Sequence, residues 1–258
     1  MGIVNDRREQ LLDLLAERRK MTIDEVAHYF DISLPTARLL CSNLSNEGKA
    51  FRMHGGIRYL PAINDTYTLA DASKEFSSEK NAIARYAGRL VADDDVVFLE
   101  AGSTIVGLAQ ALAERFDNNE LSKLVLFTNS LSNLNVLGDV CEVSLVGGRY
   151  RPNHQDFRGY LSDHLVSDLR FDYVFLGADG ISLENGIMAL DVETVRFIEI
   201  LIQRTNKLIL LADSSKFQHY SLISSVPIRK VSTIVTDTGL SDELCSKYTD
   251  IGVNIVRV

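Results

Sequence analysis

The first apolar pattern of the chain predicts a pair of short amphipathic helices. Between Asp6 and Arg19, leucines recur at helical spacing with charged residues on the opposite side, at Leu11, Leu12, Leu14 and Leu15. Asp6 is suited to cap this helix, with Glu9 as its capping-box partner three residues later. A second capping box begins at Thr22, and the helix that it starts has a predicted inner face of Ile23, Val26, Ala27 and Phe30.

A third helix is predicted directly after the turn 31–33. Ser33 is its expected cap, and Pro35 is tolerated in the first turn because the amide there has no helical partner. One buried stripe follows at spacings of three, four and seven, formed by Ala37, Leu40, Cys41 and Leu44. Gly48 is predicted to end the helix as the residue that adopts a left-handed conformation.

Two short strands, 50–53 and 57–60, flank the pair Gly55-Gly56, and this pattern predicts a β-hairpin. Three helices followed by a hairpin define a winged helix-turn-helix, so residues 1–60 are expected to form a DNA-binding domain. Pro61 ends this domain. Residues 61–75 have no apolar periodicity and are predicted to be a linker.

From residue 76 to 258 the pattern changes to alternating strands and helices. After a helix through residues 83–91, apolar strands are predicted at 96–99, 124–127, 143–146, 173–176, 208–212, 233–236 and 253–257. Helices separate most of them, at 104–115, 130–138, 161–169, 191–205 and 241–249. This alternation predicts an α/β domain with a doubly wound, mostly parallel sheet that is covered on both faces.

Composition narrows the class of protein. The 258 residues contain no run of about eighteen apolar residues that would span a membrane, and the charged N-terminus is not a signal peptide. Cys41, Cys141 and Cys245 are far apart, which is typical of reduced thiols in a cytoplasmic protein, and neither they nor the histidines have metal-ligand spacing. The net charge is −8, but residues 1–60 contain nine Lys and Arg against eight Asp and Glu, so the basic groups are concentrated there.

The predicted third helix has a free face that suits the major groove of DNA. Arg38 can bind guanine or a phosphate, and Leu39 can contact a thymine methyl group. The candidate DNA-binding residues are Thr22, Ser33, Thr36, Arg38, Leu39, Ser42 and Asn43, with Arg52, His54 and Arg58 in the hairpin. A helix-turn-helix can also serve as a protein-interaction module, and this alternative stays open.

Polar turns follow five of the predicted strands. A turn at the carboxyl end of a parallel strand, directly before a helix, presents backbone amides that favour anions. The candidate effector-binding residues are Glu100, Gly102, Ser103, Thr104, Asn129, Gly148, Arg151, Asp179 and Lys216. Asp179 can accept hydrogen bonds from sugar hydroxyls, and Arg151 or Lys216 can pair with phosphate. Together the turns predict a pocket for a polyol phosphate.

The chain resembles the DeoR family of bacterial transcription regulators. The N-terminal motifs are Arg7-Arg8-Glu9-Gln10 and Phe51-Arg52-Met53-His54-Gly55-Gly56, and the later motifs include 100–104, 128–130, 147–148, 175–181 and 211–217. This resemblance implies a sensor domain with a fold like ribose-5-phosphate isomerase and glucosamine-6-phosphate deaminase, a phosphorylated sugar or related metabolite as effector, and no cofactor. It identifies a repressor of a carbohydrate operon, which is expected to act on repeated DNA sites as a homo-oligomer, a dimer or a tetramer.

Two motifs depart from the family pattern. Leu39-Leu40-Cys41 stands where the family usually has Arg-Asp-Leu, and Glu100 stands where its first sensor turn usually begins with Asp. The DNA-binding role therefore transfers to Arg38, and no arginine role transfers to Leu39.

The rival interpretation is an enzyme related to sugar-phosphate isomerases or deaminases, in which Asp179 and Lys216 would move protons. The chain lacks a Lys-Gly-Gly-Gly turn like that of the isomerase and a His-Glu pair near the fourth turn like that of the deaminase. A DNA-binding module would also serve no purpose in a metabolic enzyme. The sequence therefore favours a regulator.

Overall fold

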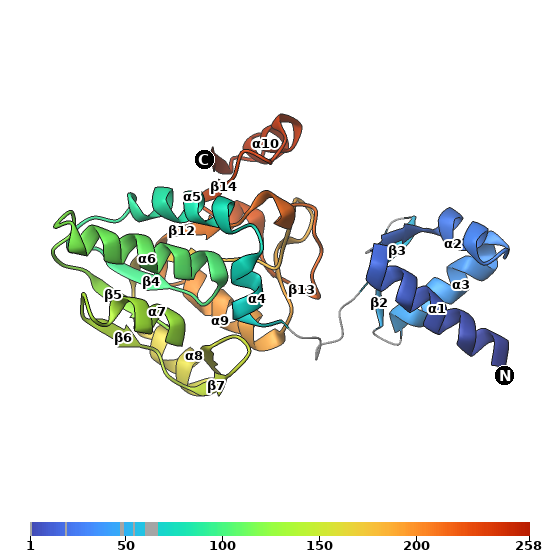
Figure 1. Ribbon diagram of the computed structural model, residues 1–258, viewed down its shortest axis with the longest axis horizontal. Coiled ribbons are helices and arrows are strands. Elements are labelled where there is room, and N and C mark those ends of the chain that lie inside the picture. Colours follow the sequence, from blue (N-terminus) through green and yellow to red (C-terminus); the bar gives the residue numbers. More distant parts are fainter. Residues whose placement is uncertain (1, 19, 47–48, 54, 60–66) are drawn as a thin grey trace. The chain divides into compact units, whose positions relative to one another are not determined.

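A computed structural model describes residues 2–18, 20–46, 49–53, 55–59 and 67–258. The chain divides into two compact units, residues 1–65 and residues 66–258 (Figure 1). Each unit has its own apolar core.

The first unit is a winged helix-turn-helix. Its helices are α1 (Gly2–Arg18), α2 (Ile23–Tyr29) and α3 (Leu34–Asn46). Its strands are β1 (Lys20–Thr22), β2 (Ala50–Met53) and β3 (Gly56–Tyr59), which form an antiparallel sheet in the order β1-β3-β2. The predicted stripe of α3 is buried, and it packs with Leu11, Leu15 and Val26 in one cluster.

Three details of this unit differ from the sequence predictions or lie beyond them. α1 begins at Gly2, so Asp6 lies inside the helix and does not cap it. Gly56 belongs to β3, where a Cβ atom would lie 2.6 Å from the carbonyl oxygen of Met21, so glycine is needed there for close approach to β1. The predicted stop at Gly48 lies outside the described residues, as does most of the predicted linker.

The second unit is built on a seven-stranded sheet in which every neighbouring pair is parallel. The spatial order is β15 (Asn254–Arg257), β14 (Thr233–Thr236), β12 (Thr205–Leu211), β9 (Phe171–Leu176), β4 (Val96–Leu99), β5 (Val125–Thr128) and β6 (Val143–Leu145). From β4 the chain proceeds outward through β5 and β6, and then returns to β9 on the other side. The order therefore reverses between β4 and β9, and such a switch point opens a crevice at the carboxyl ends of the strands.

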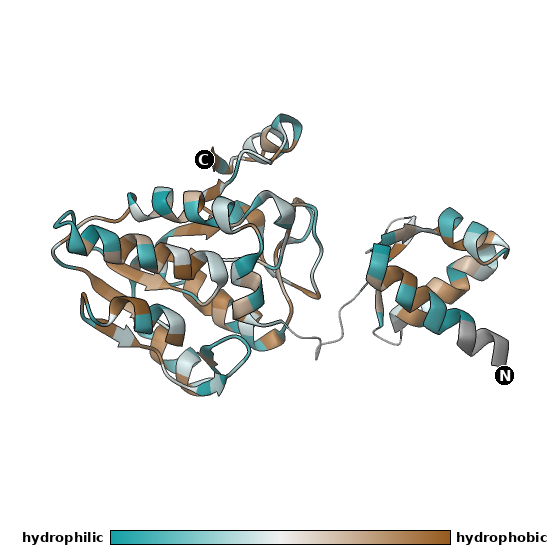
Figure 2. Ribbon diagram, in the orientation of Figure 1, coloured by the Kyte–Doolittle hydropathy of each residue, from teal (hydrophilic) through white to brown (hydrophobic). Residues whose placement is uncertain are grey.

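Alternate residues of the strands supply two cores, one on each face of the sheet. Val97, Leu99 and Phe175 pack with α5 (Ser77–Gly88), α6 (Ser103–Asp117) and α7 (Leu131–Leu137). Phe98 and Val174 pack on the opposite face with α8 (Tyr160–Ser167), α9 (Val192–Ile202) and α10 (Asp242–Thr249). In Figure 2 the central strands are hydrophobic along their length, as expected for a sheet buried on both sides. The predicted doubly wound α/β fold is confirmed.

The chain also forms elements that the sequence analysis did not predict. The predicted linker 61–75 contains a helix, α4 (Leu69–Lys74), which Thr68 caps and whose Leu69 is buried. The short strands are β7 (Arg149–Arg151) with β8 (Asp156–Arg158), and β10 (Gly180–Ser182) with β11 (Gly186–Ala189) and β13 (Ile223–Val226). Most of these segments are rich in polar residues or glycine and lack the continuous apolar run that marks the strands of the large sheet.

Candidate functional site

The free face of α3 is exposed as the sequence predicted. Thr36, Arg38 and Leu39 lie on the exposed side, and Leu39 is 61% exposed although it is apolar. Ser33 caps the helix, because its hydroxyl contacts the Thr36 hydroxyl at 2.8 Å and accepts a hydrogen bond from the Thr36 amide at 3.4 Å. The helix therefore presents one cation, Arg38, beside an exposed leucine.

Several of the predicted DNA-binding side chains have partners within the first unit. The Ser42 hydroxyl donates to the carbonyl of Arg38 at 2.8 Å, and the Arg52 guanidinium donates to the Ser42 hydroxyl. These contacts connect the wing to the recognition helix. Asn43 is half-buried, as is Arg58 on β3, and His54 lies outside the described residues.

Thr22 has a structural role that DNA contact would compete with. Its hydroxyl accepts a hydrogen bond from the Glu25 amide at 3.1 Å, and the Glu25 carboxylate accepts one from the Thr22 amide at 2.6 Å. These two bonds are the capping box predicted for α2.

We expect Thr22→Ala to lower the free energy of unfolding of the first unit by about 1 kcal/mol, because the cap hydrogen bond is lost. Chemical denaturation followed by circular dichroism measures this loss. Thr22→Ser keeps the hydroxyl and should retain most of the stability. Equal stabilities for the alanine and serine variants would contradict the capping role.

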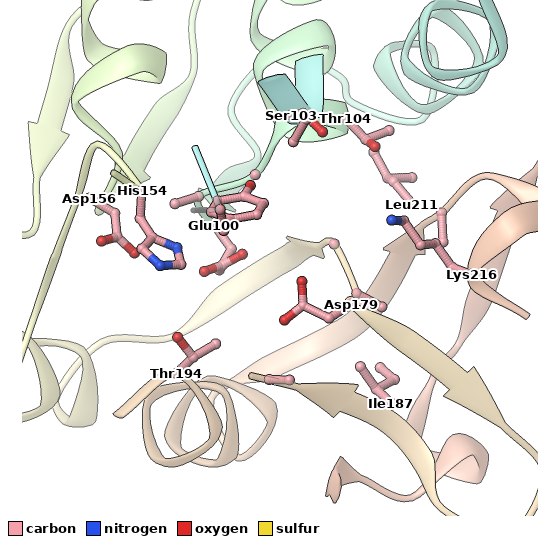
Figure 3. A pocket seen from close by; sticks show the side chains of 18 of the residues that line it. Glu100, Ser103, Thr104, His154, Asp156, Asp179, Ile187, Thr194, Leu211 and Lys216 are labelled. Carbon is pink, nitrogen blue, oxygen red and sulfur yellow. The ribbon is translucent and has the colours of Figure 1, made fainter. Parts of the chain in front are cut away.

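The second unit has a pocket at the switch point between β4 and β9. Seven of the nine predicted effector residues line it: Glu100, Gly102, Ser103, Thr104, Arg151, Asp179 and Lys216. They come from the turns after β4, β9 and β12 and from the hairpin β7–β8. Figure 3 shows Glu100, Asp179 and Lys216 around the pocket, with Ser103 and Thr104 on its rim.

The other two predicted residues do not line the pocket. Asn129 is fully buried, and its amide donates to the carbonyl of Phe157 at 3.3 Å. A Cβ atom on Gly148 would lie 2.7 Å from the carbonyl oxygen of Arg158, so this glycine allows close approach to β8. Both residues therefore contact β8, whose Asp156 and Arg158 line the pocket.

The two arginines of the pocket are held by carboxylates. Arg151 forms a two-pronged contact with Asp156, at 2.8 and 2.6 Å, and also pairs with Asp191 at 2.9 Å. Arg158 donates to Glu100 and lies 3.3 Å from Asp156. These pairs neutralise both guanidinium groups, so neither is available as an uncompensated cation.

Burial raises the pKa of two carboxyl groups in the pocket. The pKa of Glu100 is about 7, because desolvation outweighs the attraction of Arg158, and Asp156 raises it further. The pKa of Asp179 is also raised by desolvation, while the charge of Lys216 and a hydrogen bond of 3.0 Å from the Leu190 amide lower it. Glu100 can therefore exchange a proton near neutral pH.

Two ammonium groups of the pocket are not neutralised in this way. The Lys80 Nζ donates to the carbonyl of Ala72 at 2.6 Å, and no carboxylate of the described residues forms an ion pair with Lys80 or Lys216. Burial lowers the pKa of Lys80, Asp213 raises it, and the charge of Lys216 lowers it again. The two lysines therefore lie within electrostatic reach of each other beside the start of α6, where backbone amides favour an anion.

Sequence reasoning missed nine polar residues that line the pocket: Tyr67, Glu75, Lys80, His154, Asp156, Arg158, Asp191, Thr194 and Asp213. Lys80 lies on the inner side of α5 among apolar residues, and a lysine on an apolar stripe was the available signal. Tyr67 and Glu75 lay in the predicted linker, and Asp213 lay in the polar turn from which only Lys216 was chosen. The other residues belong to the hairpin β7–β8 or to the start of α9, which had not been predicted in detail.

The raised pKa of Glu100 gives a prediction for stability against pH. Because the folded-state pKa of about 7 exceeds the ordinary value of 4.5, protonation of Glu100 stabilises the folded state, and this stabilisation is lost as pH rises from about 4.5 through 7. We expect the free energy of unfolding of the wild type, relative to Glu100→Gln, to be higher at pH 5 than at pH 8. Urea unfolding at both pH values measures the difference, with Glu199→Gln as an exposed control. A difference that is constant or grows with pH would contradict the assignment.

Together, an exposed recognition helix in one unit and a polar pocket at the sheet edge of the other define a ligand-responsive DNA-binding regulator. The DeoR-like helix-turn-helix domain model matches residues 7–61, and the DeoR C-terminal sensor domain model matches residues 75–238. The chain belongs to the DeoR family of transcriptional regulators.

Similar proteins agree with this family. The chain is 27% identical to the HTH-type transcriptional regulator GolR of Listeria innocua over 97% of each chain. It is 29% identical to the HTH-type transcriptional repressor CsqR of Escherichia coli, over 98% of this chain and 95% of that one. A solved D-ribose-5-phosphate isomerase in complex with phospho-erythronic acid is 20% identical over 55% of this chain and 54% of its own, with a TM-score of 0.42. Among the described residues, no helix is long and apolar enough to cross a membrane.

Proposed function

We propose that this regulator represses a carbohydrate-use operon and releases its DNA when a phosphorylated sugar or related metabolite binds the pocket of the second unit. In this proposal the protein acts in the cytoplasm, as a dimer or tetramer, because one winged helix reads only a short half-site. The names of similar proteins support the direction of regulation, since one is a transcriptional repressor and another is a putative aga operon transcriptional repressor.

The observation that carries the choice of ligand is the uneven distribution of charge in the pocket. Lys80 and Lys216, without ion-pair partners among the described residues, lie beside the start of α6, whereas Arg151 and Arg158 are neutralised by carboxylates. We assign the phosphate to the lysine side, together with Ser103 and the amides of the helix start. The carboxyl groups of Glu100 and Asp179 are then left for sugar hydroxyl groups.

Tyr67 provides a route from the pocket to the chain segment that leads to the first unit. Its ring lines the pocket and stacks on His154 with ring centroids 4.7 Å apart, and two residues later the Leu69 amide donates to the Asn153 carbonyl at 2.8 Å. A ligand that displaces either ring would alter how the start of the second unit is held. For the ligand to lower DNA occupancy, it must bind the DNA-incompetent state more tightly.

A thermal-shift screen of pentose and hexose phosphates against their unphosphorylated sugars tests the ligand class. We expect at least one phosphate to raise the melting temperature, because a ligand that binds only the folded state stabilises it in proportion to the logarithm of its concentration. Stabilisation by the free sugars alone, with none by the phosphates, would contradict the proposal.

We further propose that the pocket binds its ligand without converting it. Incubating the protein with the phosphates that stabilise it, and following the products by mass spectrometry or nuclear magnetic resonance, tests this part. Turnover that is lost in Asp179→Asn would restore the enzyme interpretation.

A further inference from the structure

Leu39 lies at the centre of the exposed face of α3. Successive residues of an α-helix are about 100° apart around its axis, so Leu39 lies about 150° from the middle of the buried stripe. Its neighbour Arg38 lies on the flank of the exposed face. Leu39 is 61% exposed, the largest exposed fraction of any large apolar side chain among the described residues of the first unit. An apolar side chain therefore occupies the position of α3 that extends most directly away from the core.

The polar side chains that surround Leu39 on this face are held within the first unit. The Thr36 hydroxyl contacts the Ser33 hydroxyl at 2.8 Å. The Ser42 hydroxyl donates to a backbone carbonyl one turn earlier, also at 2.8 Å, and Asn43 is half-buried. These groups must give up a contact or move before they can bind a base. Leu39 has no hydrogen bond to lose, and its surface is already exposed.

Arg38 contributes to a different surface of the unit. With Arg52, it lines a cleft beside the turn at Gly55, and Leu39 is not among the residues that line this cleft. Asp24 also lines the cleft, so the two guanidinium groups leave it with one net positive charge. Guanidinium groups match the geometry of phosphate oxygens. This arrangement favours the DNA backbone as the partner of Arg38, and it leaves base edges to Leu39.

The major groove offers one apolar group to such a side chain. All four bases present hydrogen-bond donors or acceptors there, and only thymine adds a methyl group, at C5. A leucine placed against the polar edge of another base would exclude water from donors or acceptors without replacing their hydrogen bonds, which costs free energy. Against thymine, the same leucine buries the methyl group and gains a hydrophobic contact.

We propose that Leu39 determines the sequence preference of this regulator by selecting one thymine in each half-site through its C5 methyl group. The inference rests on the proposed function, in which α3 lies in the major groove of promoter DNA. It deepens that function, since it names the base that the exposed face of α3 recognises. The wild type should therefore distinguish thymine from uracil, which differs from it only in lacking this methyl group.

Replacing single thymines by deoxyuridine in a DNA duplex tests the inference. The duplex is obtained by selection from random sequences with the full-length wild type, and fluorescence anisotropy measures its affinity. At one thymine of a half-site, deoxyuridine should weaken binding about 4-fold, because the contact with one methyl group is lost, and substitution in two half-sites should weaken it about 15-fold. Cytosine at this position should also weaken binding, and 5-methylcytosine should recover part of that loss.

Variants of Leu39 separate a direct contact from an effect of deoxyuridine on the duplex itself. Leu39→Ala should bind the thymine and deoxyuridine duplexes equally, whereas Leu39→Met should retain the preference because it keeps the apolar bulk. Leu183→Ala is the matched control, because Leu183 is an exposed leucine on the turn between β10 and β11 of the second unit, and it should show the wild-type preference. Circular dichroism checks that each variant is folded.

Wild-type affinity that no single deoxyuridine changes would overturn the inference, and so would a folded Leu39→Ala variant that keeps the wild-type preference for thymine. Either result leaves the proposed regulator intact, because the wild type still binds DNA. A wild type that selects no duplex from the random sequences would overturn both the proposed function and the inference.

Discussion

Replacing Arg38 by alanine is expected to weaken promoter binding by about 10- to 100-fold for each winged helix bound, because a contact to a base or phosphate is lost. Arg38 is exposed on α3, while the stripe on the opposite side of the helix is buried, so the substitution removes a surface charge and leaves the core intact. Fluorescence anisotropy with labelled promoter DNA measures the affinity. If Arg38 binds a phosphate, the slope of log affinity against log salt concentration should also decrease in magnitude by about one for each winged helix bound.

Arg85→Ala is the matched control for this experiment. Arg85 is an exposed arginine on α5 of the second unit, and its loss changes the net charge by the same amount. We expect wild-type affinity from this control. Undiminished DNA affinity in Arg38→Ala would contradict the assignment of α3 as the reading helix.

The second large effect is expected at Lys216. Lys216→Ala should retain promoter affinity but lose the response to sugar phosphate, because the variant removes one of two ammonium groups that face the proposed phosphate position. A charge-assisted hydrogen bond to phosphate contributes about 1.5–3 kcal/mol, so ligand affinity should fall by about 10- to 100-fold. Isothermal titration calorimetry with the stabilising phosphate measures this loss.

Lys230→Ala controls for the removal of an exposed lysine from the same unit. Asp179→Asn tests the other side of the pocket, where the proposed contact is to sugar hydroxyl groups and not to phosphate. We expect Asp179→Asn to reduce discrimination among sugars, and Lys216→Ala to reduce discrimination between phosphorylated and free sugars. A Lys216→Ala variant that responds like the wild type would mean that the phosphate does not bind there.

The elements that carry an apolar run, an apolar stripe or a helix cap could be predicted from the sequence. The buried stripe of α3, the capping box at Thr22 and the seven parallel strands follow from patterns of apolar residues and caps that act within a few positions. Each pattern depends on residues within a few positions of one another, so these elements can be predicted without knowing which distant residues they contact.

The composition of the pocket could be predicted only in part. The turns at Glu100, Asp179 and Lys216 lie at strand ends of one sheet, and the convergence of strand ends follows from the parallel topology. The arginine partners could not be predicted, because the contacts of Arg151 with Asp191 and of Arg158 with Glu100 join residues 40 and 58 positions apart. Sequence reasoning offered Arg151 or Lys216 as the phosphate ligand. Arg151 pairs with two carboxylates, so the proposed role stays with Lys216 and is extended to Lys80.

In the proposed function, the first unit of the chain binds promoter DNA, and a ligand in the second unit controls this binding. The most direct measurement is a titration of the full chain against DNA from upstream of its own and neighbouring genes, with and without the sugar phosphates that raise its melting temperature. We predict tight binding that falls steeply with salt and weakens at least tenfold when the effective phosphate is added. Promoter affinity that no stabilising phosphate changes would contradict the claim.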